Sequence, residues 1–261
     1  MINMLHFQFR RLYKRATPYI FLGILLALIL METPSLLISY ELWPQYEHEI
    51  YIYSILDDSF YELDRFVSLL IAEFVGIFVT EDRVNGTTKN IYSKGYSRVK
   101  IFFSKYLATI SIPVLFYLLI FISGILIGFI NAAITQPNSQ LFFWEGHDYG
   151  YIFELIIIFL KYIVITTLFY MLSELVSSTG GAIALNIFAP VIIAAVIGIL
   201  FNYTGLRLLS QAFICILSFF IPSQMITHFS MTAERMITSV VLILLFGGLS
   251  LLITVKKQIK N

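Results

Sequence analysis

Long apolar runs separated by short polar intervals fill most of the chain. An α-helix needs roughly 20 apolar residues to cross a bilayer, and only helices or closed barrels satisfy the backbone there. The pattern predicts an all-α polytopic membrane protein, with residues 1–261 forming a single transmembrane domain. Six transmembrane helices are expected at about residues 18–40, 61–80, 99–133, 151–176, 182–201 and 236–255.

Two further segments are apolar but are not expected to cross. Residues 1–16 mix apolar and basic positions at helical spacing, which predicts an N-terminal interfacial helix on the inner membrane surface. The alternative is a basic segment that only fixes orientation. Residues 206–233 contain an apolar stretch too short for a span, ended by Pro222. They predict an outer re-entrant hairpin between the fifth and sixth spans.

The charge distribution sets the orientation. The chain is 59% hydrophobic and only 13% charged, which excludes an ordinary soluble domain. Residues 41–65 carry seven acids against the single base Arg65, so they read as an outer loop. Six spans then place both termini in the cytoplasm with most of the Lys and Arg residues, as the positive-inside rule requires. These are Arg10, Arg11, Lys14, Arg15, Arg83, Lys89, Lys94, Arg98, Lys100, Lys105, Lys256, Lys257 and Lys260.

Motifs of catalysis are missing from the sequence. It contains no phosphate-binding G-x-x-x-x-G-K-[ST], no H-E-x-x-H and no G-x-S-x-G. The four histidines share no ligand-like spacing, and the single Cys215 cannot form an internal disulfide. No basic patch has the interleaved aromatic residues of a nucleic-acid site. We therefore expect no catalytic residues, no metal, no cofactor in this chain and no nucleic-acid partner.

Polar residues inside the predicted spans are candidates for a translocation path, because such residues are costly in lipid. The alternative is that they lie near helix ends, pair with neighbours such as Lys161, or hydrogen-bond between helices. The candidates are Glu32, Glu73, Asn131 and Asn186.

The most polar interval between two spans is residues 81–98, where six of 18 residues are charged. Gly86 favours a turn and Thr87 can cap a following helix, so a short helix is expected from Thr88. Gly95 can end that helix, and Ser97 can cap the third span. We interpret the interval as a cytoplasmic coupling helix between spans 2 and 3; the alternative is an ordinary charged loop.

These residues also carry a resemblance. The run Glu81 … Asn85-Gly86-Thr87-Thr88-Lys89-Asn90-Ile91 … Lys94-Gly95-Tyr96-Ser97-Arg98 … Phe103-Ser104-Lys105 resembles the permease subunits of type-2 ABC exporters. That group includes bacterial peptide-antibiotic efflux, bacteriocin immunity and toxin-peptide export proteins. The layout of the whole chain is similar too, although the outer loop at residues 41–65 is larger than in most relatives.

The resemblance implies a multi-pass subunit of the bacterial plasma membrane that moves amphipathic peptides or other hydrophobic compounds outward. Its partners would be a second permease copy and two cytoplasmic ABC ATPase subunits, which would bind the ATP and Mg. The implied ATPase-coupling residues are Glu81, Asn85, Gly86, Thr87, Lys89, Asn90, Gly95, Ser97 and Arg98. The alternatives are a non-transporting membrane sensor or accessory subunit, and an intramembrane protease.

Overall fold

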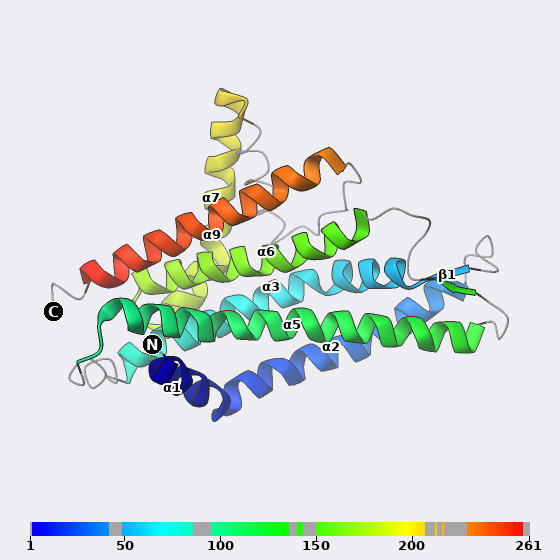
Figure 1. Cartoon of the computed structure of the whole chain (residues 1–261), viewed down its shortest axis with the longest axis horizontal. Coiled ribbons are helices and arrows are strands. Elements are labelled where there is room, and N and C mark those ends of the chain that lie inside the picture. Colours follow the sequence, from blue (N-terminus) through cyan, green and yellow to red (C-terminus); the bar gives the residue numbers. More distant parts are fainter. Residues whose placement is uncertain are drawn as a thin grey trace.

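The computed structural model of the chain is a helical bundle (Figure 1). It describes residues 2–41, 49–85, 95–135, 140–142, 150–206, 212, 216 and 229–257. Both termini lie at the same end of the bundle, on the left of Figure 1. That arrangement agrees with an even number of crossings.

The described residues include one short and six long helices with defined bounds. The short helix is α1 (Ile2–Tyr13). The long helices are α2 (Ala16–Glu41), α3 (Ile52–Val84), α5 (Arg98–Thr135), α6 (Gly150–Leu175), α7 (Thr179–Thr204) and α9 (Phe229–Lys257). Helix α7 leans away from the other long helices (Figure 1). Each predicted span corresponds to one of these helices.

Five helices in the described part of the chain are long and apolar enough to cross a membrane. They contribute the segments Ala16–Thr33, Arg98–Ile130, Leu155–Leu175, Thr179–Thr204 and Ala233–Lys256. Helix α3 does not meet this criterion, since it carries acids in its first half and charges in its last turn. The chain is therefore a multi-pass membrane protein by the length and composition of its helices.

Helix α3 begins earlier than the sequence predicts. Residues 52–60 were expected in the outer loop and are helical instead. The first half of α3 buries Phe60, Leu63 and Val67, which are spaced three and four residues apart. The acids between them concealed this pattern, because they made the segment read as a polar loop.

The fold is not purely helical. Strands β1 (Glu49–Tyr51) and β2 (Gln140–Phe142) pair in parallel, with Ile50 opposite Leu141. They lie at the end of the bundle opposite the termini (Figure 1). Three-residue strands with apolar residues are too short for the alternation pattern to reveal, so sequence reasoning missed them.

Most of the predicted re-entrant hairpin at residues 206–233 lies outside the described residues. Its last part is corrected, since α9 begins at Phe229 and not near residue 236. Glu234 and Arg235, which precede the predicted span, lie within this helix. The Glu234 carbonyl accepts a hydrogen bond from the Thr238 hydroxyl at 2.7 Å.

Helix α1 turns its apolar face toward the bundle. Met4, Gln8 and Leu12 are buried, and the Tyr13 hydroxyl donates to Ser111 Oγ on α5 at 3.0 Å. The predicted N-terminal helix is thus present. Its buried face is covered by protein.

A close crossing joins α3 to α7. A Cβ placed on Gly76 would lie 2.9 Å from Ile183 Cγ1 and 3.2 Å from the Ile183 backbone nitrogen. On the turns either side, Thr80 Oγ1 donates to Thr179 Oγ1 at 3.0 Å, and Asn186 Nδ2 donates to the Ala72 carbonyl at 3.0 Å. A small residue between two hydrogen bonds is typical of tightly packed membrane helices.

We expect Gly76→Ala to lower the free energy of unfolding by about 1–3 kcal/mol, because the added methyl group would force α3 and α7 apart. Unfolding of the purified protein in detergent micelles measures this. The matched control is Gly23→Ala, where a Cβ meets nothing within 4 Å. There the better helix propensity of alanine should leave stability unchanged or raise it by up to about 1 kcal/mol. Equal effects of the two substitutions would contradict the close crossing.

Candidate coupling site

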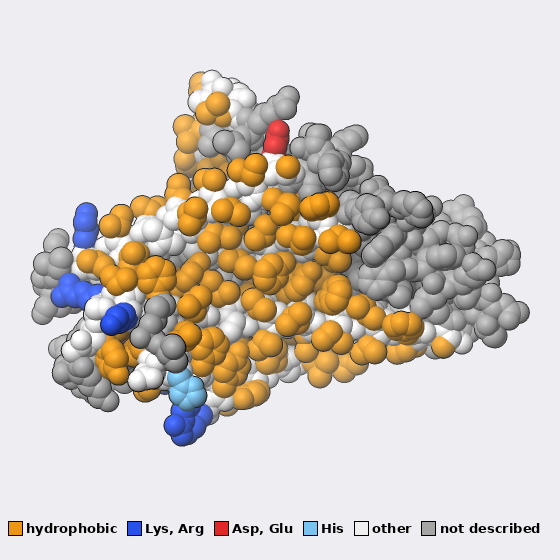
Figure 2. All heavy atoms as spheres, in the orientation of Figure 1, with side chains coloured by type: hydrophobic (Ala, Val, Ile, Leu, Met, Phe, Trp, Pro, Cys, Tyr) orange, Lys and Arg blue, Asp and Glu red, His pale blue; other side chains and the backbone are white. Residues whose placement is uncertain are grey.

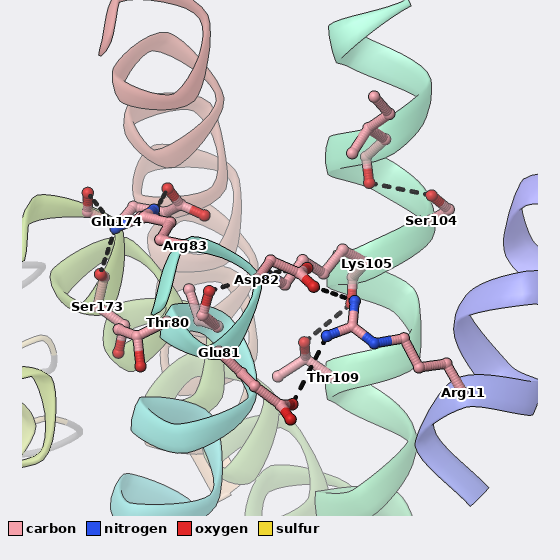
Figure 3. Close-up of polar contacts among 12 residues, drawn as sticks. Arg11, Thr80, Glu81, Asp82, Arg83, Ser104, Lys105, Thr109, Ser173 and Glu174 are labelled. Carbon is pink, nitrogen blue, oxygen red and sulfur yellow. Dashed lines mark hydrogen bonds and ion pairs between the residues drawn. The ribbon is translucent and has the colours of Figure 1, made fainter. Parts of the chain in front are cut away.

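The last turn of α3 carries three consecutive charged residues, Glu81, Asp82 and Arg83. Successive residues of a helix point in different directions, so each one meets a different neighbour. Figure 3 shows these side chains between α1, α5 and α6. They form the first part of the polar interval at residues 81–98.

Asp82 joins α3 to two other helices. Its carboxylate, 5% exposed, forms ion pairs with Arg11 of α1 and with Lys105 of α5, whose Nζ lies 2.8 Å from Asp82 Oδ2. Lys105 Nζ also donates to the Val79 carbonyl at 2.8 Å and lies 5.9 Å from the centre of the Phe78 ring. Buried charges are stable only when paired in this way, so the three side chains depend on one another.

Glu81 connects the same turn to the link between α1 and α2. It forms an ion pair with Arg15, and its Oε2 lies 3.6 Å from Arg11 Nη2. Burial and the nearby Arg11 lower the pKa of Arg15, whereas Asp82 raises it. Both partners of the Glu81–Arg15 pair remain partly exposed, so this contact is worth less than the Asp82 contacts.

Arg83 reaches the end of α6. It forms an ion pair with Glu174 and donates to the carbonyls of Ser173, Glu174 and Val176 at 3.2, 3.2 and 2.6 Å. These carbonyls have no helical partner of their own, and the partial negative charge at a helix C-terminus favours a cation. Arg83 therefore caps α6 from a neighbouring helix.

The interval returns to the bundle at its other end. Gly95 has φ of 75°, in the left-handed region that favours glycine. The Ser97 carbonyl accepts the Ile101 amide at 3.1 Å, so Ser97 occupies the cap position predicted for it. Arg98 Nη1 donates to the Val255 carbonyl at 3.2 Å, near the end of α9. Both ends of the interval thus contact other helices.

Four predicted coupling residues, Gly86, Thr87, Lys89 and Asn90, lie outside the described residues. Asn85 is exposed in the turn after α3, and its amide donates to the Glu81 carbonyl at 2.9 Å.

The residues predicted to line a path lie on four different helices. Glu73 is exposed on α3, and Glu32 is half-buried on α2. Asn186 is fully buried, and besides the Ala72 carbonyl it donates to Ser173 Oγ at 3.0 Å. Asn131 belongs to α5, and its side chain lies outside the described part. Asn186 therefore forms interhelical hydrogen bonds, one of the two roles considered for it.

A second buried ion pair lies closer to the opposite end of α3. Asp64 of α3 pairs with Lys161 of α6, and both side chains are at most 10% exposed. Tyr162 packs beside them with its ring centre 6.4 Å from that of Tyr117. Sequence reasoning missed this pair, because Asp64 lies where the predicted span 61–80 overlaps the acidic loop 41–65 and no spacing rule links it to Lys161.

The chemistry of these clusters is that of charge pairing between helices. Among the described residues, no three His, Cys, Asp or Glu side chains gather as metal ligands would. Buried acids need cations nearby, and this rule is the only signal in the sequence that Asp82 would contact residues such as Arg11 and Lys105. It could not select the partners.

The sequence matches, over residues 66–256, the family described as ABC-2 family transporter protein. The chain belongs to the ABC-2 transporter family. No curated protein matches it. Members of the ABC-2 family are membrane components of ABC transporters, so this ABC-2 protein is the permease component and works with ABC ATPase subunits.

The matched range of the ABC-2 protein includes the whole polar interval at residues 81–98 and helices α5, α6 and α7. It does not include α1, which supplies Arg11. The acidic turn of α3 thus lies inside the matched range, and its partner helix α1 lies outside it.

Proposed function

We propose that this permease is the membrane half of an ATP-driven exporter, and that ATPase subunits dock on residues 81–98 at the cytoplasmic face. Movement of this interval during the ATPase cycle would be passed to the bundle. The cargo class that best suits the apolar spans is amphipathic peptides or other hydrophobic compounds of the kind exported by peptide-antibiotic efflux and immunity permeases.

The observation that carries the proposal is the double ion pair of Asp82 with Arg11 and Lys105. Together with the contacts of Arg83, it ties the start of the interval to α1, α5 and α6. A displaced interval therefore cannot move alone, since separating buried charges from their partners is costly. Such a connection suits transmission of force from an attached subunit.

The proposed topology has six spans with both termini in the cytoplasm. It is supported by the common position of the two chain ends (Figure 1) and by the contacts of α3 on several sides. Lys and Arg side chains gather at that same end, left of the apolar belt in Figure 2, as expected of a cytoplasmic end. In this topology α3 is the second span, and a re-entrant hairpin precedes α9.

The exposed position of Glu73 supports a polar translocation path at an interface between two permease copies. Glu73 lies about two and a half turns from Asp82 toward the middle of α3, and its side chain is exposed beside the exposed Leu69. An ionised carboxylate facing lipid at that depth is costly, so protein or water should cover it in the assembly. We propose that Glu73 faces the path between two permease copies, with Glu32, Asn131 and Asn186 as further candidates.

Cysteine cross-linking tests the docking. In a Cys215→Ser background, Asn85→Cys and Ser97→Cys should each cross-link to a co-expressed ABC ATPase subunit, because both positions are exposed at the two ends of the interval. The matched control is Tyr203→Cys, which is 86% exposed near the far end of α7. Cross-linking at Tyr203→Cys as strong as at the other two positions would contradict docking on residues 81–98.

A substitution at Glu73 tests the path. Glu73→Gln should reduce export of a cationic amphipathic peptide on the order of tenfold, the effect of losing about 1.4 kcal/mol of interaction. Stability should be unchanged, since the side chain is exposed. Glu73→Asp keeps the charge and should retain most transport, as measured in vesicles containing the permease and its ATPase. Equal transport by the Gln variant and the parent would remove Glu73 from the path.

A further inference from the structure

Helix α1 has two different faces. One face is buried through Met4, Gln8 and Leu12. On the other side, Asn3, His6, Phe7, Arg10 and Lys14 are all exposed. Their spacings of three, four and seven place them on one side of the helix, and we call this set the cationic face.

The two cations of this face differ from their neighbours. Arg11 and Arg15 are held in ion pairs with Glu81 and Asp82. Within the described part of the chain, the side chains of Arg10 and Lys14 have no ion pair or hydrogen bond. The helix therefore uses one set of cations internally and presents another set outward.

The cationic face lies beside the lipid-facing surface. Helix α2 begins directly after α1, and its first turns expose Tyr19 (56%) and Ile20 (57%). The Tyr19 hydroxyl donates to the Tyr13 carbonyl at 2.9 Å, which fixes the end of α1 against the start of the span. Tyrosine is enriched at the level of lipid headgroups. Figure 2 shows the cations of this end next to the apolar belt.

An exposed aromatic ring completes the face. Phe7 is 46% exposed and lies on the same side of the helix as the two cations, one turn before Arg10 and two turns before Lys14. Binding of a soluble protein to this face would not explain why Phe7 lies at the edge of the membrane-facing surface. A lipid explains both parts, because the headgroup phosphate suits the cations and the acyl boundary suits the ring.

We propose that the cationic face of α1 binds the headgroups of anionic phospholipids in the cytoplasmic leaflet. Arg10 and Lys14 contact the phosphate of the negatively charged headgroup, while Phe7 inserts among the upper acyl carbons. This binding stands independently of the proposed exporter function. It holds in place the helix that carries Arg11, and Arg11 is the residue that reaches Asp82.

Fluorescence of a single tryptophan tests the proposal on the full-length chain. The reporter is Phe7→Trp with the native Trp43 and Trp144 replaced by Phe, reconstituted in phosphatidylcholine vesicles. A minor fraction of brominated phosphatidylglycerol should quench it far more than the same fraction of brominated phosphatidylcholine. The expected preference is roughly 30-fold, since each cation near the surface contributes roughly fivefold.

Neutralising both Arg10 and Lys14 should abolish the preferential quenching by brominated phosphatidylglycerol. Arg10→Gln and Lys14→Gln should each lower it roughly fivefold, and the double variant should show equal quenching by both lipids. The matched control is Lys256→Gln, an exposed lysine at the end of α9, which should leave the preference unchanged. Equal quenching in the parent, or a preference that survives in the double variant, would overturn the proposal. Equal quenching together with cross-linking of Arg10→Cys to the ATPase would assign the face to that subunit.

Discussion

Replacing Asp82 with alanine is expected to lower the free energy of unfolding by about 3–5 kcal/mol, because Lys105 would be left as a buried charge without a counter-ion and Arg11 would keep only its longer contact with Glu81. Unfolding of the purified protein in detergent micelles measures this loss. The neighbouring Glu81→Ala is the matched control. Its pair with Arg15 is partly exposed, so its cost should be at most about 1 kcal/mol.

A compensated variant separates stability from coupling. Asp82→Leu, Arg11→Met and Lys105→Met together remove the whole buried cluster and should recover most of the lost stability, since well-packed apolar residues often replace buried ion pairs without loss. If the proposed function is right, ATP-driven transport should remain impaired in this stable variant. Normal transport would show that the cluster supports the fold alone. A loss of stability no larger in Asp82→Ala than in Glu81→Ala would contradict the burial of Asp82.

Replacing Lys161 with methionine is expected to cost a similar amount, about 3–5 kcal/mol, because Asp64 would be left buried without its cation. The double variant Asp64→Asn with Lys161→Met should be clearly more stable than the single one. The interaction energy from this double-mutant cycle, measured by unfolding in micelles, reports the coupling of α3 to α6.

The control for this cycle is Lys256→Met, at an exposed lysine, which should change stability by less than about 0.5 kcal/mol. Additive effects of Asp64→Asn and Lys161→Met would refute a direct ion pair. Because the two clusters lie near different ends of α3, variants at Asp82 and Asp64 should add.

The helices could be predicted because a bilayer demands long apolar segments. The starts of α3 and α9 could not, because their first turns contain polar or charged residues. The start of α7 at Thr179 was placed three residues late. Ser178 explains the difference, since its hydroxyl accepts the Gly181 amide at 3.3 Å and its carbonyl accepts the Ala182 amide at 3.0 Å. Such a cap is visible in the sequence, but the glycines beside it favoured a turn.

The contacts of the candidate site could not be predicted, because no spacing rule links residues on separate helices. Asp82 and Lys105 were both predicted at the same end of the spans, and the structure pairs them. That Arg11 would join them depends on how α1 packs, and residues 1–16 show only that α1 is amphipathic. Asp64 was counted with the acids of the outer loop although the predicted span 61–80 includes it, so its burial against α6 was not anticipated.

The short pairing of β1 with β2 gives the two ends of the bundle different sensitivities to solution conditions. At the end near the termini, helices are joined partly through exposed charges such as the Glu81–Arg15 pair, and salt screens these. At the opposite end, strands preceding α3 and following α5 are joined through backbone groups, which neither salt nor side-chain replacement removes. Raising the ionic strength should therefore loosen one end of the permease selectively, and hydrogen exchange would reveal which amides open first.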